Sequence, residues 1–184
     1  MGCACGAQDK TKNGRKKYKS LSGQLKDLGL QIKNIDSDGN CLFRAISHQL
    51  ENTESNHLFY RKAACEYMKE HKENFIPFLD EGITFEKYVH RMSFSGVWGG
   101  NLEIYAISKK FLIEVHIHML NQPIYTIKCD KPKKTIELAY LEKEHYGSVI
   151  KNPKSGKALT NCTNINSTEN IYKDNNHNKA HLDI

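Results

Sequence analysis

The spacing of apolar residues changes once along this chain of 184 residues. Before residue 112, several segments have apolar side chains at intervals of three and four residues, the period of an amphipathic helix. From residue 113 to residue 119, apolar and polar residues alternate instead, which is typical of a half-buried strand, and further strand-like runs follow up to residue 150. Helices followed by strands predict an α+β fold, and the length suits one domain with an ordinary hydrophobic core.

The periodicity predicts four helices and four strands. We expect helices at residues 41–50, 53–71, 84–92 and 101–111. The second helix should begin after a cap at Thr53 or Ser55. Its inner face should carry Leu58, Ala64, Cys65 and Met68. The strands are expected at residues 113–119, 123–129, 135–141 and 145–150.

Two histidines lie on the polar side of the first predicted strand. His116 and His118 are two residues apart, so they share one face and could in principle bind a metal. The polar face of a half-buried strand explains them with fewer assumptions. The cysteines at 3, 5, 41, 65, 129 and 162 include no C-x-x-C pair, which argues against structural zinc. We therefore expect no metal and no cofactor.

The run DSDGNCLFRAISHQL, residues 36–50, places a cysteine where a turn becomes a helix. Asp, Gly and Asn favour turns, so Cys41 should lie in the first turn of the helix. Unpaired N–H groups and the helix dipole favour negative charge there, and a nearby histidine can lower a thiol pKa from about 8.5 to roughly 3.5–7.5. Cys41 is therefore a candidate nucleophile. The alternative is that it is a small buried hydrophobic residue.

A thiolate nucleophile needs a general base, and the chain contains 9 histidines. His145 differs from the others because it lies between two predicted strands, where a sheet edge can present a side chain to a cleft. The alternative is an ordinary polar residue in a hairpin. Neither Cys41 nor His145 is a strong signal alone.

The positive charge of the chain lies at its ends. The formal net charge is +6, but residues 21–150 hold 16 Lys/Arg against 17 Asp/Glu. A near-neutral central region argues against nucleic-acid binding. No apolar stretch approaches 18 residues, and the first residues lack the apolar core of a secretory signal. We expect a cytoplasmic protein with free thiols.

The chain divides into residues 1–20, 21–150 and 151–184. The last segment contains 8 Asn and few large apolar residues, so we expect it to be largely disordered. The first offers Gly2 for myristoylation, Cys3 and Cys5 for palmitoylation, and a basic run for an anionic membrane surface. Gly6 departs from the myristoylation pattern, which prefers Ser or Thr there. The alternative is a flexible basic tail.

Three motifs in this order resemble the ovarian tumour (OTU) family of deubiquitinating cysteine proteases. They are DSDGNCLFRAISHQL, WGGNLEIYAIS and EKEHYGSVI, and the resemblance covers roughly residues 21–150. It implies a papain-like OTU fold with a small twisted β-sheet packed between helices. It also implies a deubiquitinase, whose partners are ubiquitin, polyubiquitin chains and ubiquitinated proteins.

The resemblance assigns roles to particular residues. DGNC places the nucleophile on Cys41, EHY places the general base on His145, and Asp38 matches an acidic residue associated with this pair. The backbone of Asp38, Gly39, Asn40 and Cys41 is expected to form the oxyanion hole. The channel for the substrate's carboxyl-terminal tail is expected at Val97, Trp98, Gly99, Gly100 and Asn101.

One position departs from the family pattern. Many members carry Asn or Asp two residues after the histidine, where this chain has Gly147, which has no side chain to orient an imidazole. That role falls by default to Asp38, with a backbone carbonyl or Glu144 as alternatives. Asp38 could instead fix the loop as an Asx-turn residue.

Three functional classes follow from these observations. The first is a ubiquitin-specific cysteine protease. The second is a weak or inactive ubiquitin-binding protein with the same fold, for which Gly147 is the only hint. The third is a membrane-tethered adaptor whose acylated tail is the functional part.

Overall fold

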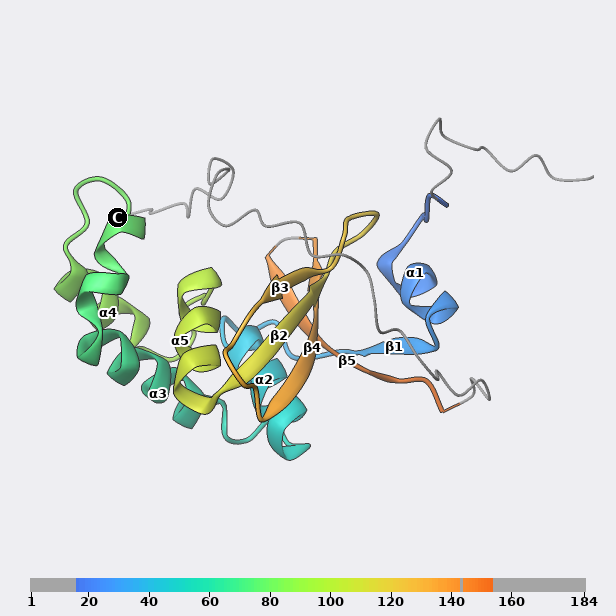
Figure 1. Cartoon of the computed structure of the whole chain (residues 1–184), viewed down its shortest axis with the longest axis horizontal. Helices are drawn as coiled ribbons and strands as arrows, with labels where there is room; N and C mark the ends of the chain where they lie inside the picture. The colour runs from blue at the N-terminus through green and yellow to red at the C-terminus, as the bar shows by residue number, and fades with distance from the viewer. Residues whose placement is uncertain (1–15, 143, 154–184) are drawn as a thin grey trace, which may run out of the picture.

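A computed structural model describes residues 16–142 and 144–153 of the chain (Figure 1). The α-helices are α1 (Leu21–Asp27), α2 (Cys41–Glu51), α3 (His57–Glu70), α4 (Phe85–Met92) and α5 (Asn101–Phe111). Two short 3-10 helices are η1 (Lys72–Asn74) and η2 (Ile76–Phe78). The strands are β1 (Leu30–Lys33), β2 (Ile113–His118), β3 (Tyr125–Ile127), β4 (Lys134–Leu141) and β5 (His145–Lys151).

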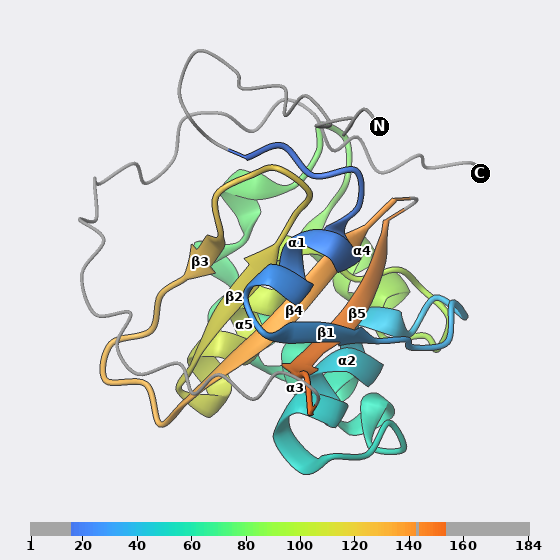
Figure 2. The same ribbon diagram turned by 90° about the vertical axis from the view of Figure 1, so that its right-hand side faces the viewer.

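The strands form one sheet in the order β1-β5-β4-β2-β3. β2 and β4 are parallel, and the other neighbours are antiparallel. The sheet separates α1 from the other helices, as the two views show (Figures 1 and 2). β5 lies between β4 and β1. Its first residue lies at one end of the sheet.

Alternation along the strands sets the two faces of the sheet. Ile113, Val115 and Ile117 of β2 are buried in the larger core, beneath α2, α3 and α5. On the opposite face, Leu21 and Leu25 of α1 pack with Ala139 and Val149. Burial of each such side chain stabilises the fold by roughly 1.5–3 kcal/mol.

The predicted α+β architecture is confirmed, and all four predicted helices and four predicted strands are present with small shifts at their ends. α1 and β1 were not predicted. Leu58 was placed on an inner face wrongly, because its side chain is 52% exposed. Asn56, rather than Thr53 or Ser55, is the N-cap of α3.

Most of the predicted end segments, 1–20 and 151–184, lie outside the described residues, as do Gly2, Cys3 and Cys5. In the part that is described, Ser20 caps α1 by accepting the N–H of Gly23. No helix in residues 16–142 or 144–153 is long and apolar enough to cross a membrane.

The two strand histidines share one carboxylate. Glu137 of β4 accepts from His116 at 2.9 Å and from His118 at 2.6 Å, and His116 also contacts Glu114 at 2.9 Å. The described residues contain no cluster suited to a metal ion. His116 is partly buried and His118 is 2% exposed, so the contacts of both with Glu137 lie largely within the sheet.

This network shifts the pKa values of His116 and Glu137 in opposite directions. The hydrogen bond to Glu137 raises the pKa of His116 above its ordinary 6.5. Burial pushes the pKa of Glu137 upward, but the bonds to His116 and His118 outweigh it and lower the pKa from 4.5 to about 2. Both charged forms therefore coexist in the folded protein at mildly acidic pH.

We predict that Glu137→Gln lowers the melting temperature most between pH 4.5 and 6.5. Below pH 6.5 the raised pKa of His116 contributes stability, which is lost as pH rises through the raised value. Above pH 4.5 the lowered pKa of Glu137 contributes stability, which is lost as pH falls toward about 2.

Thermal unfolding at about pH 5.5 and about pH 8.5 tests this prediction, with the exposed Glu142→Gln as the control. The Glu137 variant should lose a few degrees at the lower pH and less at the higher pH. An equal loss at both pH values would contradict the proposed charge pairing.

Candidate active site

The first turn of α2 begins at Cys41 because the loop before it is closed by an Asx turn. Asp38 Oδ1 accepts the Asn40 N–H at 3.0 Å, and Gly39 adopts φ 76°, which favours glycine. Asn40 is the N-cap residue, yet its side chain makes no capping hydrogen bond. The start of the helix therefore lacks a side-chain cap, and the predicted position of Cys41 is confirmed.

Three N–H groups in this loop have no acceptor on another described residue, and that of Cys41 acts on its own thiol. The amides of Asp38, Gly39 and Cys41 donate no hydrogen bond to another described residue, whereas the Asn40 amide is engaged by Asp38. Of the four residues predicted to form an oxyanion hole, three thus retain free donors. Such donors can stabilise negative charge on a carbonyl oxygen.

Cys41 is buried, with a side chain only 1% exposed. Burial raises the pKa of its thiol, although hydrogen bonding by the backbone amides of Tyr146 and Leu42 opposes the rise, and the charge of Asp38 adds to it. The predicted lowering of this pKa is wrong, because desolvation outweighs the helix N-terminus. The thiol is therefore protonated at rest and needs a base.

His145, the first residue of β5, lies next to the Tyr146 amide that acts on Cys41. Its Nδ1 atom is buried and has no hydrogen-bond partner among the described residues. Within the described residues, no hydrogen bond joins His145 to Cys41. The structure places the residue after the candidate base beside the nucleophile.

Asp38 makes its hydrogen bonds within its own segment. Its Oδ2 accepts from Arg44 Nη2 at 2.7 Å and from Asn40 Nδ2 at 3.0 Å. The bond to Arg44, helped by those to Asn40, lowers the pKa of Asp38 despite partial burial. These contacts correspond to the loop-fixing alternative, and the described residues show no bond from Asp38 to His145.

Gly147 is buried beside β1, with Tyr146 and Ser148 as its neighbours on β5. A Cβ atom there would lie 2.9 Å from the Ile32 methyl carbon Cγ2. Packing against β1 therefore favours glycine at this position. An aspartate introduced here would meet Ile32, so it would disturb the sheet.

A second loop, residues 93–100, packs against the Asp38–Cys41 loop. Asn40 Oδ1 accepts the Gly96 N–H at 2.9 Å and the Ser95 hydroxyl at 3.4 Å. A Cβ on Gly39 would overlap the Gly96 backbone, so the two main chains touch. This contact places the predicted channel residues next to the candidate nucleophile.

The predicted channel residues differ in exposure. Trp98 is 43% exposed, Val97 is partly buried, and a Cβ on Gly99 would lie 3.0 Å from Leu42 and Phe43 of α2. Glu103, the third residue of α5, accepts the Gly100 N–H at the start of the helix. The loop is thus held at both ends.

Two buried charged residues at this site were not predicted. Arg61 and Glu103 are each 1% exposed. The sequence signal that could have found Arg61 was its position. Arg61 lies on the same helical stripe as Ala64, Cys65 and Met68, and a charged residue is unexpected on a buried face.

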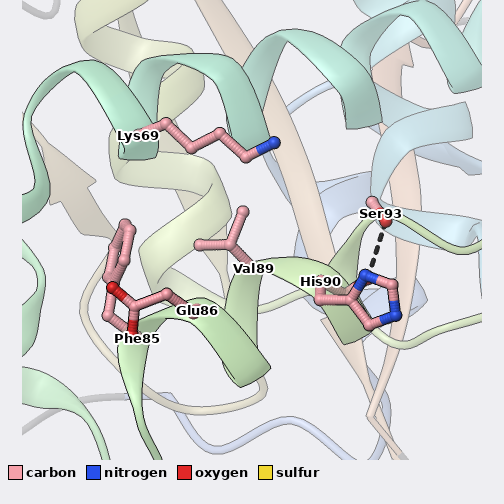
Figure 3. A pocket seen from close by; sticks show the side chains of 6 residues that line it. All are labelled: Lys69, Phe85, Glu86, Val89, His90 and Ser93. Carbon is pink, nitrogen blue, oxygen red and sulfur yellow. Dashed lines mark hydrogen bonds between the residues drawn. The ribbon is translucent and has the colours of Figure 1, made fainter.

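A separate hollow of about 360 Å³ lies between α3 and α4 (Figure 3). Its walls carry Lys69, Phe85, Glu86, Val89, His90 and Ser93. The Ser93 hydroxyl donates to the His90 backbone carbonyl at 2.6 Å. None of these residues was predicted as a site residue, and the hollow contains neither Cys41 nor His145.

Comparison with known proteins agrees with this geometry. A family described as OTU-like cysteine protease matches residues 36–177. OTU domain-containing protein 3 of Mus musculus is 41% identical over 134 residues, covering 72% of this chain and 34% of the relative. OVARIAN TUMOR DOMAIN-containing deubiquitinating enzyme 7 of Arabidopsis thaliana is 39% identical over 128 residues, covering 68% of this chain and 34% of the relative. The chain thus spans about a third of the length of these relatives.

Solved structures share the fold. The OTU domain of OTUD1 superimposes with a TM-score of 0.62 at 22% identity, covering 70% of this chain and 91% of that one. An OTU domain in complex with ubiquitin gives a TM-score of 0.53 at 22% identity, covering 65% of this chain and 69% of that one. These similarities confirm the predicted papain-like OTU fold.

We predict that Gly39→Ala opens the contact between the two loops, whereas Gly82→Ala does not. Both glycines have positive φ, 76° and 84°, so both substitutions introduce backbone strain of roughly 1 kcal/mol. Only at Gly39 does the new methyl overlap another backbone; nothing lies within 4 Å at Gly82.

Alkylation of Cys41 by iodoacetamide, followed by peptide mass spectrometry, measures the opening. Gly39→Ala should react faster than wild type and melt at a lower temperature than Gly82→Ala. Equal reactivity and equal melting of the two variants would contradict the packing described for Gly39 and Gly96.

Proposed function

The chain belongs to the OTU family of cysteine proteases, and we propose that it hydrolyses isopeptide bonds after the C-terminal glycine of ubiquitin. The observation that carries this proposal is the position of Cys41: it begins a helix, follows a loop with free amides, and lies beside the strand that starts with His145. Ubiquitin, polyubiquitin chains and ubiquitinated proteins are the proposed partners.

The first step forms a thioester. Cys41 Sγ attacks the carbonyl carbon of the ubiquitin glycine while His145 takes the thiol proton, as the raised pKa of Cys41 requires. The carbonyl electron pair moves to oxygen, where the amides of Asp38, Gly39 and Cys41 are placed to donate. When the carbonyl re-forms, the C–N bond breaks and His145 gives the proton to the leaving lysine amine.

The second step releases ubiquitin. Water attacks the thioester carbon while His145 removes a proton from it, and the C–S bond then breaks. Cys41 regains the proton and is a thiol again, and the ubiquitin tail is released as a carboxylate. No metal or cofactor takes part in these steps.

Substrate binding is proposed to align the pair. Cys41 and His145 are not hydrogen-bonded in the described residues, and Gly147 offers no orienting side chain. A ubiquitin tail lying along Val97–Asn101 would reach both loops, and the glycines there allow an extended peptide to pass close to the backbone. Asp38 supports catalysis in this scheme by holding the loop through Asn40 and Arg44.

A second candidate function is a ubiquitin-binding protein with weak or no catalysis. It is favoured by the same unlinked state of Cys41 and His145. The two candidates differ in turnover rather than in binding.

We expect the wild-type chain to cleave ubiquitin-aminocoumarin and di-ubiquitin, because attack by Cys41 needs only the groups described above. Cys41→Ala should abolish turnover, and His145→Ala should lower it by about 100-fold or more, the usual contribution of a general base. Cys129→Ala, at a buried cysteine not placed in the site, should retain turnover.

Fluorescence release and gel analysis measure these rates. Binding of ubiquitin to the wild type without any turnover would support the second candidate. Turnover that survives in Cys41→Ala would rule out the proposed nucleophile.

The N-terminal segment is proposed to tether the protein to the cytoplasmic face of a membrane. Gly2, Cys3 and Cys5 can carry acyl chains, and residues 10–19 supply basic side chains for an anionic leaflet. Two acyl signals with a polybasic segment give stable anchoring.

Gly2→Ala should move the protein from the membrane fraction to the supernatant, because alanine at this position cannot be N-myristoylated. Ala7→Gly, a neighbouring change that keeps Gly2, should stay with the membranes. Cell fractionation checks both. A Gly2 variant that remains equally membrane-bound, or a wild type that is never bound, contradicts the tethering proposal.

A further inference from the structure

Arg61 is a buried cation whose hydrogen bonds reach both loops of the proposed active site. It lies on α3, and its side chain is 1% exposed. Nη2 lies 3.0 Å from the Gly39 carbonyl oxygen, 2.8 Å from Asn40 Oδ1 and 2.6 Å from the Val97 carbonyl oxygen. Nη1 donates to the Met92 carbonyl at 3.0 Å, where α4 ends.

The charge of Arg61 is not neutralised by a contacting carboxylate in the described residues. The guanidinium lies over the Phe43 ring at 4.3 Å, and Nε has no hydrogen-bond partner there. Burial lowers the pKa of Arg61, and the nearby Glu103 and Asp38 carboxylates oppose this effect. Burying a cation that is held mainly by carbonyl oxygens costs free energy, so its position is expected to have a use.

The carbonyl contacts identify that use. The peptide group between Gly39 and Asn40 is held on both sides: its oxygen faces Arg61 Nη2, and its N–H faces Asp38 Oδ1 at 3.0 Å. Holding this peptide plane restricts the directions of the flanking amides of Gly39 and Cys41, which belong to the adjoining peptide groups. Those are two of the three free donors of the proposed oxyanion hole.

Arginine suits this position better than lysine. Its planar fork carries several donors in fixed directions, so one side chain can bind two loops and a helix end together. A lysine ammonium would keep the charge, but it is a single point that cannot span Met92 and Gly39 in the same geometry.

We propose that Arg61 is a positioning residue that holds the Gly39–Asn40 peptide and the Val97 segment in register, so that the oxyanion amides face the scissile carbonyl. The inference rests on the proposed hydrolysis, and it extends the active site to α3. Arg61 does not touch the reacting atoms and acts through the loop.

The test compares Arg61→Lys and Arg61→Gln with Lys62→Met, a change at the next, solvent-facing residue of α3. Three quantities are measured: kcat and KM for ubiquitin-aminocoumarin, the rate of Cys41 alkylation by iodoacetamide, and thermal unfolding. Alkylation forms no oxyanion, so it reports the thiol independently of the oxyanion amides.

We expect both Arg61 variants to lower kcat by about 100-fold, the usual cost of losing an oxyanion donor, with KM changed by less than about threefold. Their alkylation rates should stay near that of the wild type, and Lys62→Met should change none of the quantities. A merely structural role would alter alkylation and kcat together.

These measurements separate failure of the Arg61 inference from failure of the proposed function. A wild type without turnover contradicts that function and this inference with it. A wild type with turnover and Arg61 variants of unchanged kcat overturn the inference alone. Loss of a cooperative unfolding transition in both variants would make Arg61 a residue of the fold, which also overturns it.

Discussion

The side-chain oxygen of Asn40 is the acceptor that holds the active-site loops together. It receives the Gly96 amide, the Ser95 hydroxyl and Arg61 Nη2, at 2.9, 3.4 and 2.8 Å. Because this oxygen is committed to neighbouring segments, it does not cap α2, and the helix start lacks a side-chain cap. The hydrogen bonds to this one oxygen therefore join the two loops, and they leave backbone N–H donors of the loop available for chemistry.

Burial governs the electrostatics around these loops. It raises the pKa of the Cys41 thiol and of Glu103, while the partly exposed Asp38 keeps a lowered pKa because Arg44 binds it. The nucleophile is thus protonated at rest, and proton transfer to His145 becomes part of the attack.

Periodicity in the sequence was enough to predict α2 to α5 and β2 to β5, because each buries a regular stripe of apolar side chains. The short elements α1 and β1 escaped prediction, since seven and four residues carry too little periodic signal. Cys41 and His145 could be found from local motifs and their resemblance to a family. The direction of the thiol pKa could not, because it depends on how closely α2 and β5 pack. Arg61 could not be assigned to the site because its partners are 21 to 36 residues away along the chain.

The central claim is that Cys41 is the nucleophile of a site shaped for ubiquitin. The most direct measurement is reaction of the purified chain with ubiquitin carrying a C-terminal thiol-reactive group, followed by peptide mapping of the adduct. The account predicts one adduct, on Cys41, which disappears in Cys41→Ala and is blocked by free ubiquitin in excess. A folded wild type that forms no adduct, or an adduct on another cysteine, would contradict it.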